Sequence, residues 1–464
     1  MRMPMRFGCI ALAVFLAFLA ELEGASDPTA SVSDLHLPIA FTVLPLDSPH
    51  GGDVGAKAAY QYLQHPQMKL FVFHNAPLNN PTFGTGFVGW LRDKHHHAIV
   101  SSIKNTYDID EFVVDARTGK IAATPTKCVR SGCSWGNTSY KAASYIDAPQ
   151  VVYDKDDPRR ILKYIFLARE SDSSHVETSG LVWTVDERGN PLNRPYIATS
   201  HGCTVSPSGE YLACESPSAD TSCQNGIRIL KAPDGAHGAC VRRSQECVNG
   251  AAIGYWSPDS KGFAYYSQSN EGKGCDADSF PQLDSRNGWV VYYRLGSDPM
   301  KFHPDQAFQL TADLSPSQRH NWSPGRFCFG LGMDDGFMRC KQLLTGLGTE
   351  PMAWTDDSHY LYFSAVDRSQ PQPYARMLGS ISIANDDDGA LKIGQFRPLL
   401  ARQLLASGYA AVSPSGTRIS LLGSSTLADP RAQLFVYNRN SHKLIQLTHT
   451  IGRKQIYAPH WHPN

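Results

Sequence analysis

A short pattern recurs along this chain of 464 residues and restricts its possible folds more than any other feature. Each copy has a large apolar residue, a turn rich in Ser, Pro, Asp and Gly, and then a run of β-prone residues. The clearest copies begin at Val205, Trp256, Trp354 and Val412, and a fragment begins at Trp461. A repeat of about 50 residues with about four strands in each unit is typical of a β-propeller.

The spacing of the copies predicts the number of blades. The interval from Trp256 to Trp354 is about twice the period, so one copy between them is degenerate, and Trp322-Ser323-Pro324 is the candidate. A weaker copy lies at Tyr153. With a closing blade, these copies predict a single all-β propeller of seven four-stranded blades, or of six if the segment at Trp322 is only a loop. Tryptophan at a fixed repeat position favours packing between blades over a sugar-binding surface.

The two ends of the chain carry further expectations. The last residues, Tyr457–Asn464, begin a new blade, and we expect them to pair with N-terminal material near residues 97–120 and so close the ring. Arg2 and Arg6 precede an apolar run over residues 7–20, which has the length of a signal-peptide core and is too short to span a bilayer. The alternative is a short membrane anchor that stays attached.

These features divide the chain into three segments. Residues 1–25 are the predicted signal peptide, and residues 26–94 fit no blade and are expected to form an N-terminal arm or a small cap. Residues 95–464 are the predicted propeller. No later stretch is long and apolar enough to span a membrane, so we expect no transmembrane segment after signal removal.

The cysteines favour an extracytoplasmic protein, either periplasmic or secreted. There are 11, and removal of Cys9 with the signal peptide leaves an even number, which favours disulfides in an exported chain. Zinc binding needs paired ligand spacing that this chain does not show. Two predicted pairs flank hairpin turns and a third can close a small loop: Cys203 with Cys214, Cys328 with Cys340, and Cys128 with Cys133. The connectivity of the others, Cys223, Cys240, Cys247 and Cys275, stays open.

The charge balance excludes one class of partner. Lys and Arg together number 43, as do Asp and Glu, so the formal net charge is zero. Without a basic excess the chain has no electrostatic footprint for phosphate backbones, and nucleic acid is not an expected partner.

The run from Trp256 to Tyr265, Trp-Ser-Pro-Asp-Ser-Lys-Gly-Phe-Ala-Tyr, resembles the repeat of TolB-type propellers. The same repeat occurs in the propellers of the dipeptidyl-peptidase group. The resemblance implies an exported binding or docking module that requires no cofactor, with another extracytoplasmic protein or a glycan as its partner. A peptidase would need a nucleophile elbow, and the formal match around Ser134 lacks the strand–helix context.

Histidines near the predicted inner strands suggest an alternative function. Side chains at the starts of inner strands converge on one mouth of a propeller, where imidazole and oxygen donors suit a divalent metal such as zinc or manganese. This arrangement resembles oligogalacturonate lyases and would imply a metal-dependent polysaccharide lyase or hydrolase. Histidine beside a Ser-Pro turn can also be a simple hydrogen-bonding residue. The candidate ligands are His201, His320, His460, His462 and Gln455.

Overall fold

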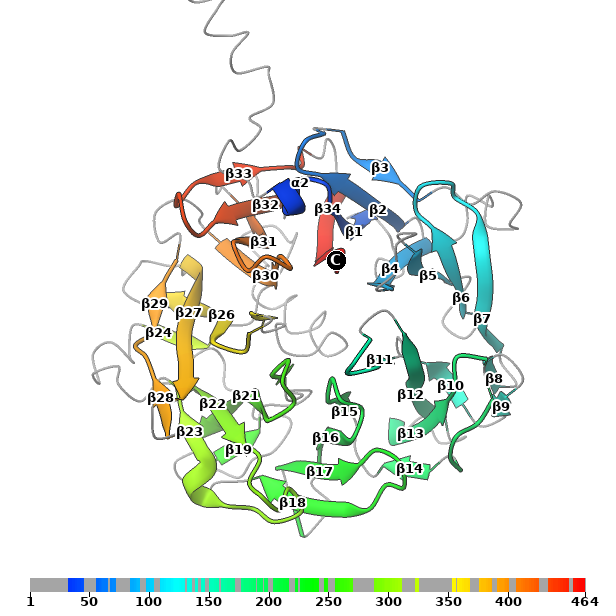
Figure 1. Ribbon diagram of the computed structural model, residues 1–464, viewed down its shortest axis with the longest axis vertical. Helices are drawn as coiled ribbons and strands as arrows, with labels where there is room; N and C mark the ends of the chain where they lie inside the picture. The colour runs from blue at the N-terminus through cyan, green and yellow to red at the C-terminus, as the bar shows by residue number, and fades with distance from the viewer. Residues whose placement is uncertain are drawn as a thin grey trace, which may run out of the picture.

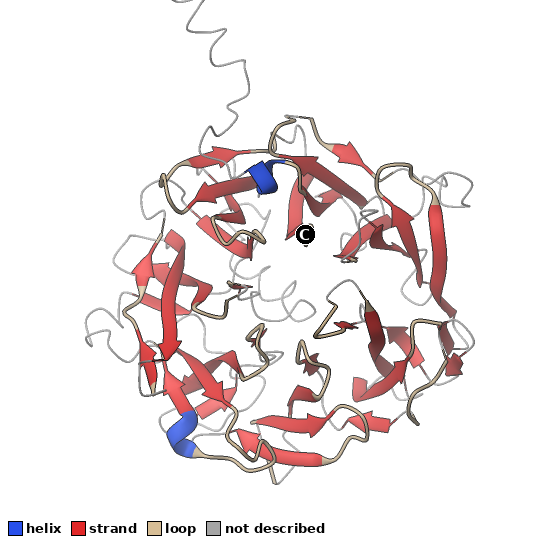
Figure 2. Ribbon diagram, in the orientation of Figure 1, coloured by secondary structure: helices blue, strands red, loops and turns tan. Residues whose placement is uncertain are grey.

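The computed structural model shows a ring of β-sheets (Figure 1). It describes residues 32–45, 56–65, 67–71, 84–91, 97–103, 109–129, 132–135, 138–140, 143–146, 150–157, 160–171, 177–188, 190–194, 196–198, 203–216, 222–223, 226–241, 246–248, 255–269, 288–310, 322–324, 353–355, 357–367, 375–385, 390–399, 406–424, 433–449 and 454–463. Within these ranges helix is limited to α2 (Val32–Leu35) and η3 (Pro304–Gln306) (Figure 2). No helix in the described part of the chain has the length and apolar character needed to cross a membrane.

The ring has seven four-stranded blades, as the repeat spacing predicts. We number them 1 to 7 and give the strands of each from the ring axis outward (Figure 1). Blade 1 contains β34 (Lys454–Trp461), β1 (Pro38–Pro45), β2 (Lys57–Tyr62) and β3 (Lys69–Leu70). Blade 2 contains β4 (Gly84–Trp90), β5 (His97–Ile103), β6 (Ile109–Asp115) and β7 (Ile121–Val129), and β8 (Gly132–Trp135) and β9 (Thr138–Tyr140) extend its sheet.

Blades 3 to 5 follow the same plan. Blade 3 contains β11 (Gln150–Tyr153) with β10 (Ala143–Ile146), then β12 (Ile161–Ser171), β13 (Glu177–Val185) and β14 (Tyr196–Ala198). Blade 4 contains β15 (Cys203–Val205), β16 (Tyr211–Glu215), β17 (Ile227–Lys231) and β18 (His237–Val241). Blade 5 contains β20 (Tyr255–Trp256) with β19 (Glu246–Val248), then β21 (Gly262–Ser269), β22 (Gly288–Arg294) and β23 (Ala307–Gln309).

Blades 6 and 7 complete the ring. Blade 6 contains β25 (Ala353–Trp354) with β24 (Trp322–Pro324), then β26 (Tyr360–Asp367), β27 (Ala375–Asn385), and β28 (Leu391–Ile393) with β29 (Arg397–Pro398). Blade 7 contains β30 (Ala406–Val412), β31 (Arg418–Ser424), β32 (Gln433–Asn438) and β33 (Leu444–Gln446).

The count of seven is right, but two of its markers differ from the prediction. Trp322 lies on β24, which pairs with β26 in the same blade as Trp354, so it begins no blade of its own. The copy that completes the count is instead blade 2, which begins at β4 and contains Trp90. The repeat pattern does not reveal it because Leu91-Arg92-Asp93 stands in place of the Ser-Pro residues.

The C-terminal strand pairs with a different segment from the expected one. β34 is antiparallel to β1, with Trp461 opposite Ile39 and Ile456 opposite Val43. Residues 97–120, the expected partner, include β5 and β6 of blade 2 instead. Residues 26–94, expected as an arm or cap, include β1 to β4, and these strands lie within the ring (Figure 1).

The same turn follows the inner strand in four blades. Its first residue has a buried side chain, its backbone N–H donates to the carbonyl five residues later, and its fourth residue has positive φ. A positive φ suits glycine, yet two of the four blades have serine there. The first residues are Ser206, Ser257, Thr355 and Ser413, and the fourth are Gly209, Ser260, Ser358 and Gly416.

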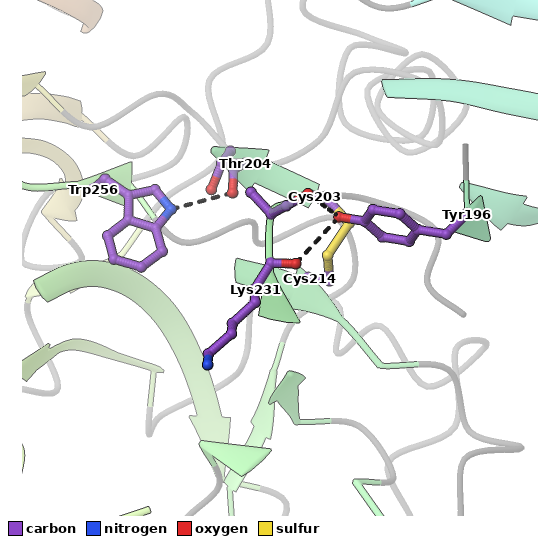
Figure 3. Close-up of a disulfide and its surroundings, with 7 residues drawn as sticks. Tyr196, Cys203, Thr204, Cys214, Lys231 and Trp256 are labelled. Carbon is purple, nitrogen blue, oxygen red and sulfur yellow. Dashed lines mark hydrogen bonds between the residues drawn. A yellow bond between two sulfur atoms is a disulfide. The ribbon is translucent and has the colours of Figure 1, made fainter. Parts of the chain in front are cut away.

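Neighbouring blades are joined by a repeated hydrogen bond from a tryptophan indole. The nitrogen Nε1 of the last inner-strand residue in one blade donates to a carbonyl oxygen of the preceding blade, over 3.0 to 3.2 Å. Figure 3 shows the bond between blades 5 and 4. The expectation that tryptophans at the repeat position pack between blades is therefore met for Trp256, Trp354 and Trp461, while the side chain of Trp322, the fourth expected, lies outside the described ones. The four bonds are Trp256 to Thr204, Trp354 to Tyr255, Trp461 to Ala411 and Trp90 to His460.

Candidate functional site

The predicted metal ligands are only partly within the described structure. His201 and His320 lie outside the described residues, and Gln455 is on β34 with its side chain outside them. His460 and His462 lie two residues apart at the end of the chain, and both rings face blade 2. The His460 ring lies 5.4 Å from that of Phe87. Among the described residues, no group of three or more His, Cys, Asp or Glu side chains is placed to hold a metal ion.

His462 and His460 differ in their access to solvent. The side chain of His462 is buried with its ring 4.9 Å from that of Trp90. His460 is exposed. It precedes the last inner-strand residue of its blade, and the equivalent positions in the other blades carry no histidine. We call these seven residues the axial ring: Gly89, Val152, Thr204, Tyr255, Ala353, Ala411 and His460.

The protonation of His460 reflects its place inside the ring. Protein surrounds the imidazole at longer range, and this desolvation lowers its pKa to about 4. The residue nevertheless retains contact with solvent, so its effect on stability is smaller than that of a histidine sealed in the core. At neutral pH the imidazole is uncharged and its lone pair is available to a ligand.

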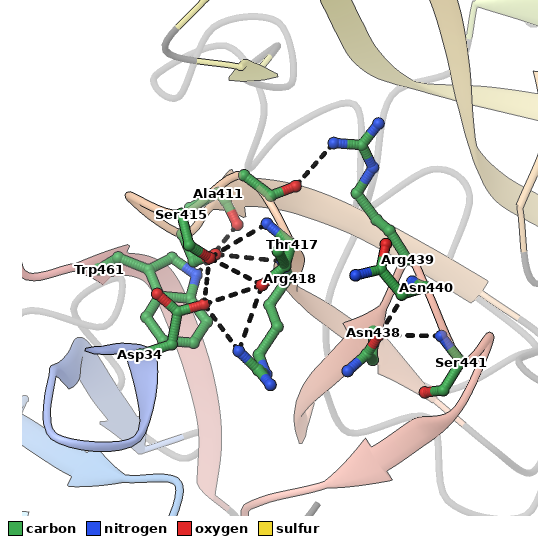
Figure 4. Close-up of polar contacts among 12 residues, drawn as sticks. Asp34, Ala411, Ser415, Thr417, Arg418, Asn438, Arg439, Asn440, Ser441 and Trp461 are labelled. Atoms are coloured by element: carbon green, nitrogen blue, oxygen red, sulfur yellow. Dashed lines mark hydrogen bonds and ion pairs between the residues drawn. The ribbon is translucent and has the colours of Figure 1, made fainter. Parts of the chain in front are cut away.

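A second candidate site lies on the turns that follow the inner strands and those that join the two outer strands. We call this surface the turn face. Arg439, in the turn after β32, donates from Nη1 to the carbonyl of Gly416, 2.6 Å away (Figure 4). Its guanidinium carbon lies 4.7 Å from the ring centre of Tyr360 and 5.8 Å from that of Tyr362. Both are cation–π distances, so Arg439 joins blades 7 and 6 on this face.

The group around Tyr360 combines an aromatic ring with charges of both signs. Tyr360 is 36% exposed, and His359 and Asp357 are exposed beside it. Partial burial opposes ionisation of Asp357, but hydrogen bonds from the Thr355 hydroxyl and the His359 backbone lower its pKa overall. We define the Tyr360 patch as Asp357, His359, Tyr360 and Arg439.

Sequence reasoning missed a buried ion pair that fixes the N-terminal segment. Arg418 Nη1 lies 2.7 Å from Asp34 Oδ2, and both side chains are fully buried (Figure 4). The same oxygen accepts hydrogen bonds from the hydroxyls of Ser415 and Thr417. The sequence does carry one signal of this pair, because Arg418 occupies the repeat position that holds Tyr211, Gly262 and Tyr360 in other blades. The two charged side chains are closed to solvent, although Ser415 beside them is exposed, and the pair attaches the N-terminal segment to blade 7.

Two disulfides cross blade 4. Cys203 and Cys214, paired by the sequence analysis, are directly opposite on β15 and β16 and are bonded (Figure 3). A second bond joins Cys223 to Cys240, whose partners the sequence left open. Disulfides are compatible with an extracytoplasmic location.

The remaining cysteine and serine predictions have different outcomes. Cys128 and Cys133 are opposite each other on β7 and β8, but their side chains lie outside the described ones, and Cys328 and Cys340 lie outside the described residues altogether. Ser134 lies on strand β8 between two antiparallel neighbours, which differs from the strand-to-helix turn of a nucleophile elbow.

Comparison with known proteins concerns the fold alone. No family model matches the chain, and no curated protein matches it. Among solved structures it is similar to TolB from Acinetobacter baumannii, at 12% identity and a TM-score of 0.38, over 93% of this chain and 68% of that one. It is also similar to puromycin hydrolase, at 13% identity and a TM-score of 0.47, over 91% of this chain and 54% of that one. A third similar structure is an oligogalacturonate lyase in complex with manganese, at 11% identity and a TM-score of 0.43, over 82% of each chain. At these values the likeness says nothing about function.

Proposed function

We propose that this protein is an exported docking module that binds another extracytoplasmic protein through the Tyr360 patch on its turn face. The supporting observation is the exposed ring of Tyr360 held 4.7 Å from the guanidinium of Arg439. Tyrosine and arginine dominate the residues that carry binding energy in protein interfaces. Two such side chains in mutual contact offer a partner a rigid apolar surface and a positive charge.

The backbone beneath the patch is already held in place. The carbonyl of His359 accepts from the N–H of Ile383 at 2.7 Å, and the N–H of Arg439 donates to Thr417 at 2.9 Å. Because the patch is ordered before binding, association loses less conformational entropy than it would at a loose loop. This favours a binding surface over a passive turn.

The test uses a photo-reactive amino acid in place of Tyr360 in the native extracytoplasmic setting. We expect one partner to be cross-linked and recovered, and Arg439→Ala to lower its binding by at least tenfold, about 1.4 kcal/mol. The matched control is Leu192→Ala, at an exposed apolar side chain on blade 3. A partner bound equally by Tyr360→Ala, Arg439→Ala and the control would refute this function.

A second candidate is a metal-dependent polysaccharide lyase or hydrolase at the ring axis. The observation that favours it is the exposed, uncharged imidazole of His460, which is the only histidine among the seven axial-ring residues. A bound zinc or manganese ion would acidify the proton beside a uronate carboxylate. Because His462 is buried against Trp90, the other ligands would have to come from His201, His320 or Gln455.

Metal content decides this second candidate. Elemental analysis of purified protein should find about one equivalent of metal, and His460→Ala should remove it. The control is His442→Ala, whose ring bonds to the Tyr437 hydroxyl on blade 7. Metal content that is unchanged in His460→Ala would exclude a site at this residue.

A further inference from the structure

Arg228 stands between the two disulfides of blade 4. Cys203 is opposite Cys214, Cys214 is opposite Arg228, and Arg228 is opposite Cys240 on the four successive strands. Directly opposed residues of an antiparallel sheet project from the same face, with their Cβ atoms about 5 Å apart. One face of the blade thus carries a row of disulfide, arginine and disulfide.

The guanidinium of Arg228 bonds to a residue next to the second disulfide. The residue is 8% exposed, and its Nη2 donates to the hydroxyl of Ser222 at 2.5 Å. Ser222 is the neighbour of Cys223 in the chain. This hydrogen bond holds the positive charge at the residue that precedes Cys223 in the chain.

The two disulfides differ in their place in the blade. Cys203 is on β15, the innermost strand, while Cys240 is on β18, the outer edge strand (Figure 1). Each bond joins one half-buried cysteine to one that is 1% exposed: Cys240 with Cys223, and Cys203 with Cys214. A protein-sized reagent can reach an edge strand but not a strand that faces the ring axis. Of the two half-buried cysteines, Cys240 on the outer strand is therefore the one that a protein partner can approach.

We propose that Cys223–Cys240 is an exchangeable disulfide, at which an exported dithiol protein attacks Cys240 and Cys223 is the leaving sulfur. The donor thiolate forms a bond to Cys240 Sγ, and the Cys223–Cys240 bond breaks, leaving Cys223 as a thiolate beside Arg228. The second donor thiol then attacks the mixed disulfide. It releases Cys240 as a thiolate that takes up a proton, and the donor leaves as its own disulfide. Two electrons pass from the donor to this chain.

Arg228 acts in this step through its charge. A cation close to a cysteine sulfur stabilises the thiolate, and a better leaving group is displaced faster and at a less reducing potential. The inner bond differs in its position, because Cys203 lies on the strand that faces the ring axis and Cys214 is 1% exposed. The proposal is independent of the Tyr360 patch, which lies on blades 6 and 7.

The experiment uses glutathione and dithiothreitol as probes on the intact protein. After brief exposure to glutathione, peptide mapping by mass spectrometry should place the adduct on Cys240 rather than on Cys223. In a dithiothreitol titration with differential alkylation, Cys223–Cys240 should open first, and Cys203–Cys214 serves as the reference within the same molecule. Adducts mainly on Cys223, or opening of Cys203–Cys214 first, would overturn the proposal.

Variants separate the charge of Arg228 from its bulk. Arg228→Met should make Cys223–Cys240 about tenfold harder to reduce, equivalent to about 30 mV for a two-electron couple. Arg228→Lys should stay close to wild type because it keeps the charge. Circular dichroism checks that each variant folds. If both variants fold and shift the equilibrium equally, the charge has no role and the assignment of Arg228 is wrong. The site of glutathione attack on the wild-type chain tests the exchange itself without any variant.

Discussion

The indole nitrogen of Trp90 lies 3.2 Å from the carbonyl oxygen of His460, although the two residues are 370 positions apart in the chain. This bond joins blade 2 to blade 1, and it repeats at three other junctions with the same residue type and the same partner position. The inner edges of the blades are thus tied to each other by polar bonds as well as by apolar packing.

Loss of this bond should weaken the ring measurably. Trp90→Phe keeps most of the apolar contact but leaves the His460 carbonyl without its indole donor, which costs about 1–3 kcal/mol. Trp461→Phe removes the equivalent bond to Ala411 and should cost a similar amount. Urea denaturation measures both, and Leu192→Ala should stay within about 0.5 kcal/mol of wild type. Equal stability of all three variants would show that the indole bonds contribute nothing.

The buried pair of Asp34 and Arg418 should be strongly coupled. Removal of one partner leaves an uncompensated charge, so Asp34→Ala or Arg418→Met should each cost about 3–5 kcal/mol. The double variant should cost clearly less than the sum of the two, as a double-mutant cycle will show. The control pair, Asp298 and Lys301, is exposed and should give at most about 1 kcal/mol. Simple additivity at Asp34 and Arg418 would contradict the pairing.

Two equivalent glycines allow a test of packing between blades. Gly209 and Gly416 occupy the same turn position with φ of 66° and 68°. A Cβ at Gly209 would lie 2.6 Å from Val152 of blade 3, whereas at Gly416 the nearest atom, in Arg439, is 4.0 Å away. Gly416→Ala should therefore show only the backbone cost of about 1–2 kcal/mol.

The same comparison isolates the clash at the other position. Gly209→Ala should cost about 1–3 kcal/mol more than Gly416→Ala, because it adds overpacking to the same backbone cost. Thermal denaturation of the two variants measures the difference. If they are equally destabilised, the contact between blades 3 and 4 relaxes without cost.

The lowered pKa of His460 predicts a pH dependence of stability. The folded-state pKa is about 4, while an unfolded histidine has a pKa of about 6.5. Between these values the unfolded chain binds more protons, so stability should fall as the pH drops from about 6.5 to about 4. His460→Gln should lose less over this window than wild type, and His359→Gln serves as an exposed control. A melting temperature that follows pH identically in all three proteins would refute the shift.

The repeat pattern predicted the architecture because blade packing places the same demand at the same position every time. Trp256, Trp354 and Trp461 were recognisable because turn-forming residues follow each of them directly in the sequence. Trp90 was missed because its turn has other residues, although its indole makes the same bond. Trp322 was overrated because a tryptophan before Ser-Pro reproduces the motif, although its strand joins the blade of Trp354.

The candidate site was less predictable for a physical reason. The Tyr360 patch joins residues of two blades, and the contact of Arg439 with Tyr360 depends on how adjacent blades pack. Likewise the pairing of Cys223 with Cys240 depends on a loop path that no turn motif defines, whereas Cys203 and Cys214 flank one hairpin and could be paired by counting. Local symmetry is visible in a sequence, and contacts between non-adjacent segments are not.

The pairing of β1 with β34 has a consequence for how the molecule is made. Strands β1 to β3 are synthesised long before β34, the neighbour that completes their sheet. Until β34 is made, blade 1 has a strand edge with unpaired backbone groups. Closure of the ring then depends on a contact of very high sequence separation, and such contacts make folding slow and post-translational. Blade 1 is therefore a part of the ring that cannot be completed until β34 is available.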